Sequence, residues 1–170
     1  MMKFVAGLLV GICLVAVAGY LFVIQGGIAM STDAKPLPLE RSLAHKALAA
    51  SIGKSEDEKS PLPADEANLL AGAEVFKQSC AGCHGQFGQG ASGLSKRVYP
   101  HIPPLLPPAT GVTDDPVGEI HWIIKNGIRF SAMPSFGTKL SDDQLWQVSL
   151  LLHQADKLPA AVQEALGSKK

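Results

Sequence analysis

The hydrophobic pattern divides the chain into one long apolar run and several amphipathic segments. Residues 4–24 hold no charged side chain over 21 positions. As a helix this run would be about 31 Å long, which matches the hydrocarbon core of a bilayer. We therefore predict an N-terminal membrane anchor at 1–32, with its span at about 4–24. The alternative is a cleaved signal peptide, but the run is longer than a signal's apolar region and no clear cleavage site follows Ile24.

Two segments after the anchor show the spacing of amphipathic helices. The first, 39–52, is short and lies between prolines, so it can rest on the membrane or on a folded domain. The second, 64–79, places apolar side chains three or four positions apart. Its apolar face carries Leu69, Ala73, Phe76 and Cys80.

Two later helices are predicted mainly from their ends. A helix at 116–125 begins with proline, which is favoured in a first turn, and ends at Asn126-Gly127. Ser141 and Gln144 form a capping box that opens a helix running to about 156. No segment shows the sustained alternation of a strand, so the predicted fold class is all-α.

Prolines and charged clusters set the predicted domain limits. Residues 33–66 are expected to form a linker containing the short helix, and 67–158 the compact domain. Residues 159–170 are expected to form a C-terminal tail. Between 100 and 108 five prolines exclude a helix.

Charge and composition narrow the function. The chain has 15 basic and 15 acidic residues, so its net charge is zero, and we predict no nucleic-acid partner. Only seven aromatic side chains follow residue 32. A domain with so few large side chains needs another group to fill its core.

The candidate chemistry lies in the C-x-x-C-H sequence at 80–84. Cys80 and Cys83 have the spacing of thiols that add across the two vinyl groups of haem, and His84 then presents a ring nitrogen to the iron. A covalently held haem c would also supply the missing apolar bulk. A thiol redox pair is the first alternative, but it usually accompanies a βαβ pattern. A structural zinc site is the second, but a further Cys/His pair at zinc spacing is absent.

The second ligand of the iron is predicted to be Met133. It is the only methionine after the anchor, and it lies in an irregular loop directly before Pro134. A thioether in this position raises the reduction potential and closes the coordination sphere. His101, in the proline-rich loop, is the principal rival. The other histidines are not expected to bind the iron. His45 is expected to be solvated, and His121 and His153 are expected to be at the surface or hydrogen-bonded.

Together these features resemble class I c-type cytochromes, in particular the small bacterial domains. The similarity covers about 67–156. It rests on Gly72 and Phe76, on Cys80-Ala-Gly-Cys-His84, on Asn126-Gly127-Ile128, on Met133-Pro134 and on Leu145-Trp146.

The resemblance implies a fold of three to four helices with long loops around one haem. It places Gly72 and Phe76 where the first helix packs across the last one, with Trp146 as the partner aromatic. It also implies that a backbone carbonyl of the Pro103–Pro104 region accepts a hydrogen bond from the second ring nitrogen of His84.

The predicted function is that of a membrane-anchored mono-haem cytochrome c that transfers single electrons. It is an electron carrier and not an enzyme, although it could serve as the electron-transfer subunit of an oxidase or dehydrogenase complex. The alternative is a haem enzyme or gas sensor with a labile sixth ligand, such as a peroxidase-like subunit.

The predicted haem c indicates where in the cell the protein is located. Because haem is attached to C-x-x-C-H on the outer face of bacterial membranes, we predict a single-pass protein of the cytoplasmic membrane with its C-terminal domain in the periplasm. The less favoured alternative is a soluble periplasmic protein released from a cleaved signal. Its partners are expected to be redox proteins, whose identity the sequence does not reveal.

Overall fold

The computed structural model describes residues 2–109 and 111–167. The chain forms two compact units that divide between Ser42 and Leu43. Each unit is described by itself. Within the described residues the structure contains helices, turns and loops but no strand, so the predicted all-α class is confirmed.

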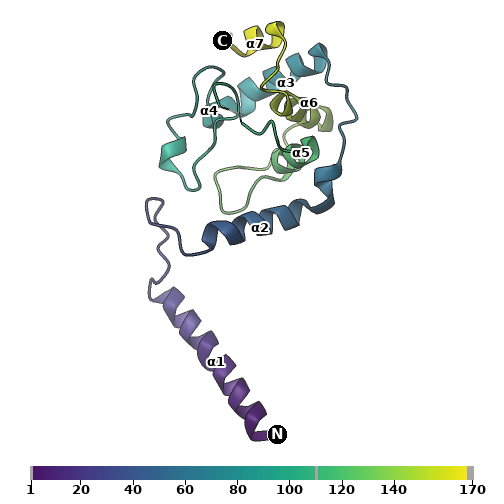
Figure 1. The fold of residues 1–170 in the computed structure, drawn as a ribbon. Coiled ribbons are helices and arrows are strands. Elements are labelled where there is room, and N and C mark those ends of the chain that lie inside the picture. Colours follow the sequence, from purple (N-terminus) through teal and green to yellow (C-terminus); the bar gives the residue numbers. More distant parts are fainter. Residues whose placement is uncertain (1, 110, 168–170) are drawn as a thin grey trace. The chain divides into compact units, whose positions relative to one another are not determined.

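The first unit contains α1 (Met2–Ile24), the 23-residue helix in Figure 1 that carries the N-terminus. None of its side chains is buried, and its length and apolar composition suffice to cross a membrane. These properties are compatible with a membrane anchor and with a signal sequence.

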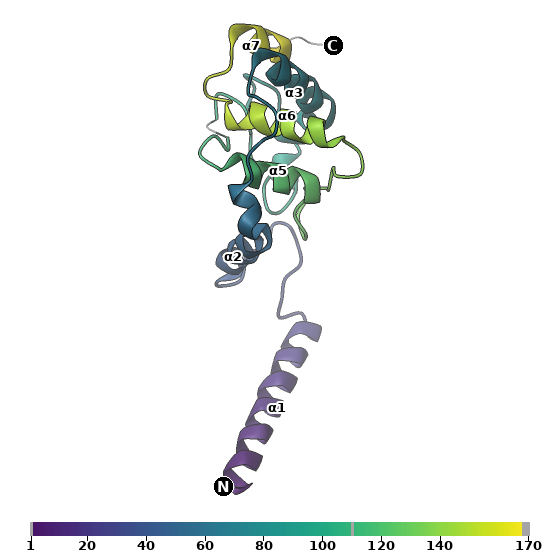
Figure 2. The ribbon, with the colours of Figure 1, turned by 90° about the vertical axis from the view of Figure 1, so that its right-hand side faces the viewer.

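The second unit consists of short helices joined by long loops (Figures 1 and 2). Because it begins at Leu43, it includes a stretch that the sequence assigns to the linker. Its elements are α2 (Glu40–Ile52, which starts just before the division), η1 (Gly53–Asp57), α3 (Glu66–Ser79), α4 (Ala81–His84), η2 (Ser95–Arg97), α5 (Val117–Asn126), α6 (Asp142–His153) and α7 (Ala160–Gly167).

The helix ends follow the local sequence signals. The Asp65 side chain caps α3 by accepting a hydrogen bond from the Asn68 amide, at 2.9 Å. Ser141 and Gln144 form the predicted capping box of α6. Gly127 ends α5 with a φ of +70°, a conformation that glycine adopts without steric cost.

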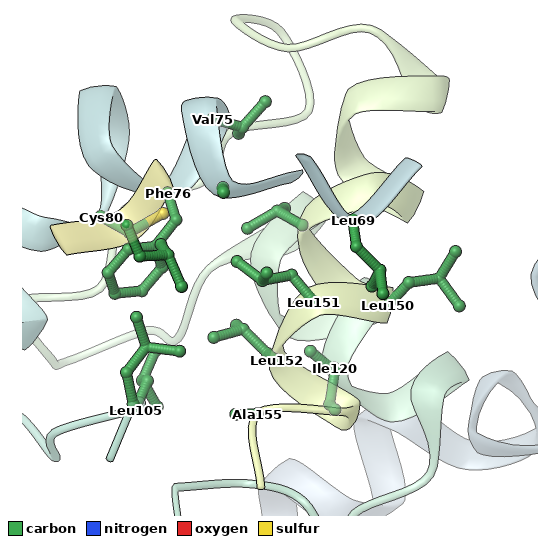
Figure 3. Packing of buried hydrophobic residues seen from close by; sticks show 14 of the residues in the cluster. Leu69, Val75, Phe76, Cys80, Leu105, Ile120, Leu150, Leu151, Leu152 and Ala155 are labelled. Carbon is green, nitrogen blue, oxygen red and sulfur yellow. The ribbon is translucent and has the colours of Figure 1, made fainter. Parts of the chain in front are cut away.

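The centre of the unit is the contact between α3 and α6. A Cβ at Gly72 would overlap the Gln147 carbonyl oxygen and lie 3.2 Å from Cβ of Leu151, so the two backbones approach each other closely because residue 72 is glycine. Phe76 and Leu151 are almost fully buried beside this contact (Figure 3). The predicted apolar face of 64–79 is confirmed, since all four of its named side chains are buried.

α5 packs against α6 through an aromatic stack. The rings of His121 and Trp146 are 3.8 Å apart between centroids and nearly parallel. The expectation for His121 is therefore wrong: it is buried, and its Nε2 atom makes no hydrogen bond. The flat face of Trp146 accommodates the imidazole, which sequence periodicity alone does not reveal.

Residues assigned from sequence to a C-terminal tail form α7, which packs on α3 (Figures 1 and 2). Val162 and Leu166 are buried there. The Lys77 ammonium of α3 donates a hydrogen bond of 2.9 Å to the Ala165 carbonyl in the last turn of α7. A cation at this end of a helix also opposes the partial negative charge of its terminus.

The packing of α7 predicts a loss of stability in Val162→Ala. The side chain is fully buried, so its removal is expected to lower the free energy of unfolding by about 2 kcal/mol. Urea titration of the purified protein measures this change. Ala161→Ser, on an exposed position of the same helix, is the control and should cost less than about 0.7 kcal/mol. Equal values for the two variants would show that α7 does not pack on the domain in solution.

Candidate functional site

The C-x-x-C-H segment continues directly from the end of α3. The Cys80 amide donates to the Phe76 carbonyl at 2.9 Å, and the amides of Cys83 and His84 both donate to the Cys80 carbonyl, at 3.1 and 3.0 Å. The chain thus turns into α4 without leaving helical geometry. Residues three apart on a helix lie on the same side, so both thiols belong to one helical surface. Cys80 is buried next to Phe76 (Figure 3), and Cys83 is half-buried.

His84 is held by the proline-rich loop. Its Nδ1 lies 2.8 Å from the Pro103 carbonyl oxygen. A carbonyl can only accept, so Nδ1 carries the proton and Nε2 keeps a free lone pair. This tautomer is the one that ligates a metal through Nε2. The structure confirms the expected carbonyl contact and identifies Pro103 as its source.

Two pKa shifts describe the chemistry of this segment before a cofactor is attached. Burial lowers the pKa of His84, against the opposing effect of the hydrogen bond to Pro103, so the neutral ligand form is favoured. Burial, together with the nearby Cys83, raises the pKa of the Cys80 thiol to about 12. A catalytic redox thiol needs the reverse shift. The thiol oxidoreductase alternative is therefore disfavoured.

Hydrogen bonds connect the glycine-rich loop after His84 to its surroundings. The Ser92 hydroxyl donates to the Cys83 carbonyl, and the Gly88 amide donates to the Pro107 carbonyl at 2.8 Å. Gly85 has a φ of +87°, and a Cβ there would overlap the Gly90 carbonyl oxygen. The loop therefore folds back tightly over the segment that carries the cysteines.

Met133 lies in the second loop, between α5 and α6. Its amide donates to the Ser131 hydroxyl and its carbonyl accepts from the Ile128 amide, both at 3.1 Å. A Cβ at Gly127 would lie 2.8 Å from the Met133 carbonyl oxygen, so this glycine permits the tight return of the loop. The Met133 side chain is half-buried against the same hydrophobic cluster that contains Cys80. The structure thus brings Met133 and Cys80 to one cluster.

The remaining histidines are engaged elsewhere. His101 is exposed, and its Nδ1 lies 3.0 Å from the Ser95 carbonyl within its own loop. His153 is half-buried with Nδ1 3.0 Å from the Asp115 carbonyl, as expected of a hydrogen-bonded histidine. His45 lies on an exposed position of α2. Across 2–109 and 111–167, no three His, Cys, Asp or Glu side chains are grouped so that they could hold a bare metal ion.

This donor set fits a covalently held haem. Two thiols on one helical surface, an imidazole whose outer nitrogen is already bonded and a thioether in the facing loop are the groups that haem attachment and ligation use. The surrounding side chains are apolar, as a largely nonpolar macrocycle requires. They include Phe76, Leu105, Leu106, Phe87, Val112 and Phe136.

Comparison with known proteins agrees with this chemistry. Residues 67–150 match the family model of cytochrome c oxidase, cbb3-type, subunit III. Cytochrome c6 of Leptolyngbya boryana is 36% identical over 95 residues, which cover 54% of this chain and 98% of that protein. The chain belongs to the small mono-haem c-type cytochromes. Its cofactor is haem c, attached covalently and containing iron, and its role is to carry electrons.

As a c-type cytochrome, the chain shows charge of one sign on the loops that form its haem site. Residues 80–113 and 126–141 contain no Asp or Glu. Their basic side chains are all exposed: Lys96, Arg97, Arg129 and Lys139. The acidic residues of the domain lie on the helices, in the turn that precedes α5, and beside helix ends at Glu58, Asp65 and Asp156.

Several residues that support the cytochrome site could not be identified from the sequence. Ser92 and Ser131 bond the backbone of the two loops through their hydroxyls, and serines at these places carry no pattern of their own. The sequence did not distinguish the Pro103 carbonyl as the partner of His84, because several residues in this run of prolines offer a backbone carbonyl. Gly127 was identified as a helix stop signal and as part of a family motif, but its role in the tight return of the Met133 loop was not.

The buried His121 predicts an acid-sensitive fold. Burial is the main cause of its lowered pKa, and Lys125 acts in the same direction, while Asp142 and Glu58 oppose the shift. The folded state therefore binds fewer protons than the unfolded state between the lowered value and the ordinary value of about 6.5. Stability is complete above that ordinary value and falls as the pH drops below it.

Urea titrations at pH 7.5 and pH 5.0 test this expectation. His121→Phe keeps the ring stack but cannot be protonated, so its loss of stability between the two pH values should be smaller than that of the wild type. His45→Gln, on an exposed position, should behave like the wild type. An equal loss in His121→Phe and the wild type would assign the acid sensitivity to other groups.

Proposed function

We propose that this protein is a membrane-anchored mono-haem cytochrome c in which Cys80 and Cys83 form the thioether bonds and His84 and Met133 are the axial ligands. The hydrogen bond between His84 Nδ1 and the Pro103 carbonyl carries this proposal. It fixes the imidazole as a neutral ligand with Nε2 available, and it comes from a loop that has no other evident reason to contact this side chain.

Haem iron supplies a one-electron couple between Fe(II) and Fe(III). The residues of the chain set the conditions for its use. His84 and Met133 would both hold the iron, which would leave no site for a substrate at the metal. The apolar cluster keeps water from the macrocycle, and the thioether ligand favours the reduced state. These contributions describe an electron carrier rather than an enzyme or a gas sensor.

We assign the domain to the periplasm and α1 to the membrane. C-type haem is attached outside the cytoplasm, and α1 has the length and composition of a single span. The N-terminus would then lie in the cytoplasm. An uncleaved anchor keeps the domain close to other membrane proteins, which raises their effective concentration.

Its partners would be redox proteins of the same membrane. The family model that matches the domain describes a subunit of a terminal oxidase, which supports a place as the electron-transfer subunit or electron donor of such a complex. The basic loops around the haem site fit a partner with an acidic surface. The proposal names this class of partner and not an individual protein.

Membrane fractionation of cells tests the anchor. The full chain should stay with membranes after a carbonate wash and should have the intact mass of residues 1–170 plus one haem. A variant with a cleavable signal in place of 1–32 should be soluble and still red. A full-length gene product recovered in the soluble fraction with a shortened N-terminus would instead show that the apolar run is a signal peptide.

A further inference from the structure

The segment between α2 and α3 is packed against the domain rather than free. Ile52, at the end of α2, is only 4% exposed. η1 follows it and contacts α5. Leu62, further along the chain, packs on the main hydrophobic cluster, and its amide is bonded to the Ser60 hydroxyl. The chain is therefore fixed at both ends of the stretch from Ile52 to Leu62.

Gly118, in the first turn of α5, is the point of closest approach. A Cβ on this residue would overlap the Ser55 carbonyl oxygen and lie 2.7 Å from that of Glu58 and 2.9 Å from that of Glu56. Three backbone carbonyls of the segment thus lie against the start of a helix. The N-terminal turn of a helix has partial positive charge, so carbonyl oxygens are well placed there.

We infer that residues 52–60 form a strut locked onto α5 at Gly118, and that this strut shortens the free chain between the haem domain and the membrane anchor. The inference rests on the proposed function, because it presumes that α1 is an uncleaved anchor. The strut limits the free chain between α1 and the folded domain to residues 25–51, in which 25–39 spans at most about 50 Å and α2 adds about 20 Å. A loose chain over 25–65 would span roughly 140 Å.

The shorter connection narrows the class of partner. A domain tied to the membrane by a short chain meets proteins of the same membrane at high effective concentration, and its access to distant sites falls steeply once the chain cannot reach them. The strut thus favours electron exchange with a membrane-resident partner whose redox site lies close to the bilayer surface. It disfavours a role as a long-range shuttle.

The strut can be released without touching the haem site. Gly118→Ala introduces a methyl group against backbone carbonyls that have no flexible side chain to move. Ile52→Ser places a polar side chain at a buried position where the strut begins, and it serves if Gly118→Ala prevents folding. Gly167→Ala, in α7 and away from the haem-site loops, is the matched control, because no atom lies within 4 Å of a Cβ built there and its φ is not positive.

Hydrogen exchange and limited trypsin digestion of the full-length protein in detergent micelles measure the release. The amides of 53–60 should exchange faster once the strut is free, because this segment can open when its packing on α5 is lost. Cleavage after Lys54 and Lys59 should accelerate roughly 10- to 100-fold in Gly118→Ala and Ile52→Ser, and should not change in Gly167→Ala. The visible spectrum of the reduced protein should be the same in all four proteins.

The possible outcomes distinguish a failure of the strut from a failure of the proposed electron-transfer function. Rapid exchange of 53–60 in the wild type, or unchanged cleavage in both strut variants, would overturn the strut while leaving the electron carrier intact. A colourless wild-type protein would instead contradict the proposed function, because the strut itself holds no cofactor.

Discussion

His84→Ala is expected to yield no stable holoprotein. The substitution removes the imidazole that Pro103 orients and leaves one face of the iron without a protein ligand. It also leaves the Pro103 carbonyl without its partner. The apolar cluster around the site would then lack the haem that fills it, so the domain should be found in small amounts and largely without colour. Absorbance of the reduced protein and the intact mass under denaturing conditions measure both effects.

The cysteine variants extend this test. Cys80→Ala and Cys83→Ala should each leave only one cysteine for thioether formation, so a smaller fraction of the protein should carry covalent haem. Molecules in which no thioether has formed should release their haem into acidified organic solvent. His101→Ala is the control, since this side chain is exposed and bonds only within its own loop. It should retain haem in full. Normal haem content in His84→Ala would show that another residue binds the iron.

Met133→Ala is expected to have the second large effect. Loss of the thioether should abolish the weak iron–sulfur absorption band near the red end of the spectrum. It should also lower the reduction potential by roughly 100 mV or more, within the range of about 0.8 V that axial ligands control in haem proteins. The open position should then bind carbon monoxide, which the wild type should not do. Covalent haem should remain, because the cysteines and His84 are untouched.

His101→Ala distinguishes the rival ligand. If His101 were the sixth ligand, the iron–sulfur band would be absent from the wild type, and the His101 variant would be the one to bind carbon monoxide. The structure favours Met133, because its side chain packs on the cluster that holds Cys80 whereas His101 is exposed. Survival of the band in Met133→Ala would exclude Met133 as the source of the sulfur ligand.

Much of the framework could be predicted because its signals are local. The capping box of Ser141 and Gln144 and the apolar face of α3 are set by neighbours within one or two turns. The C-x-x-C-H motif is similarly local, since covalent attachment requires its residues to be adjacent in sequence. Gly72 was predicted from a family pattern, and its close contact with Gln147 is confirmed.

The remaining features depend on contacts between distant residues. Nothing in the sequence near Val162 shows that α3 offers it an apolar surface or that Lys77 reaches the end of α7. The stack of His121 on Trp146 joins two helices, so a histidine on a helix resembles a surface residue until its partner is known. Gly118 likewise gives no local signal, because the carbonyls that require it lie about sixty positions earlier.

A spectroelectrochemical titration of the purified full-length protein tests the central claim most directly. The account predicts a single wave with a one-electron slope of about 59 mV per tenfold change in the ratio of oxidised to reduced protein. It also predicts sharp low-spin c-type bands in the reduced state that carbon monoxide does not alter. A colourless protein, a high-spin spectrum or a shift of the bands with carbon monoxide would contradict the assignment of this chain as a His84/Met133 electron carrier.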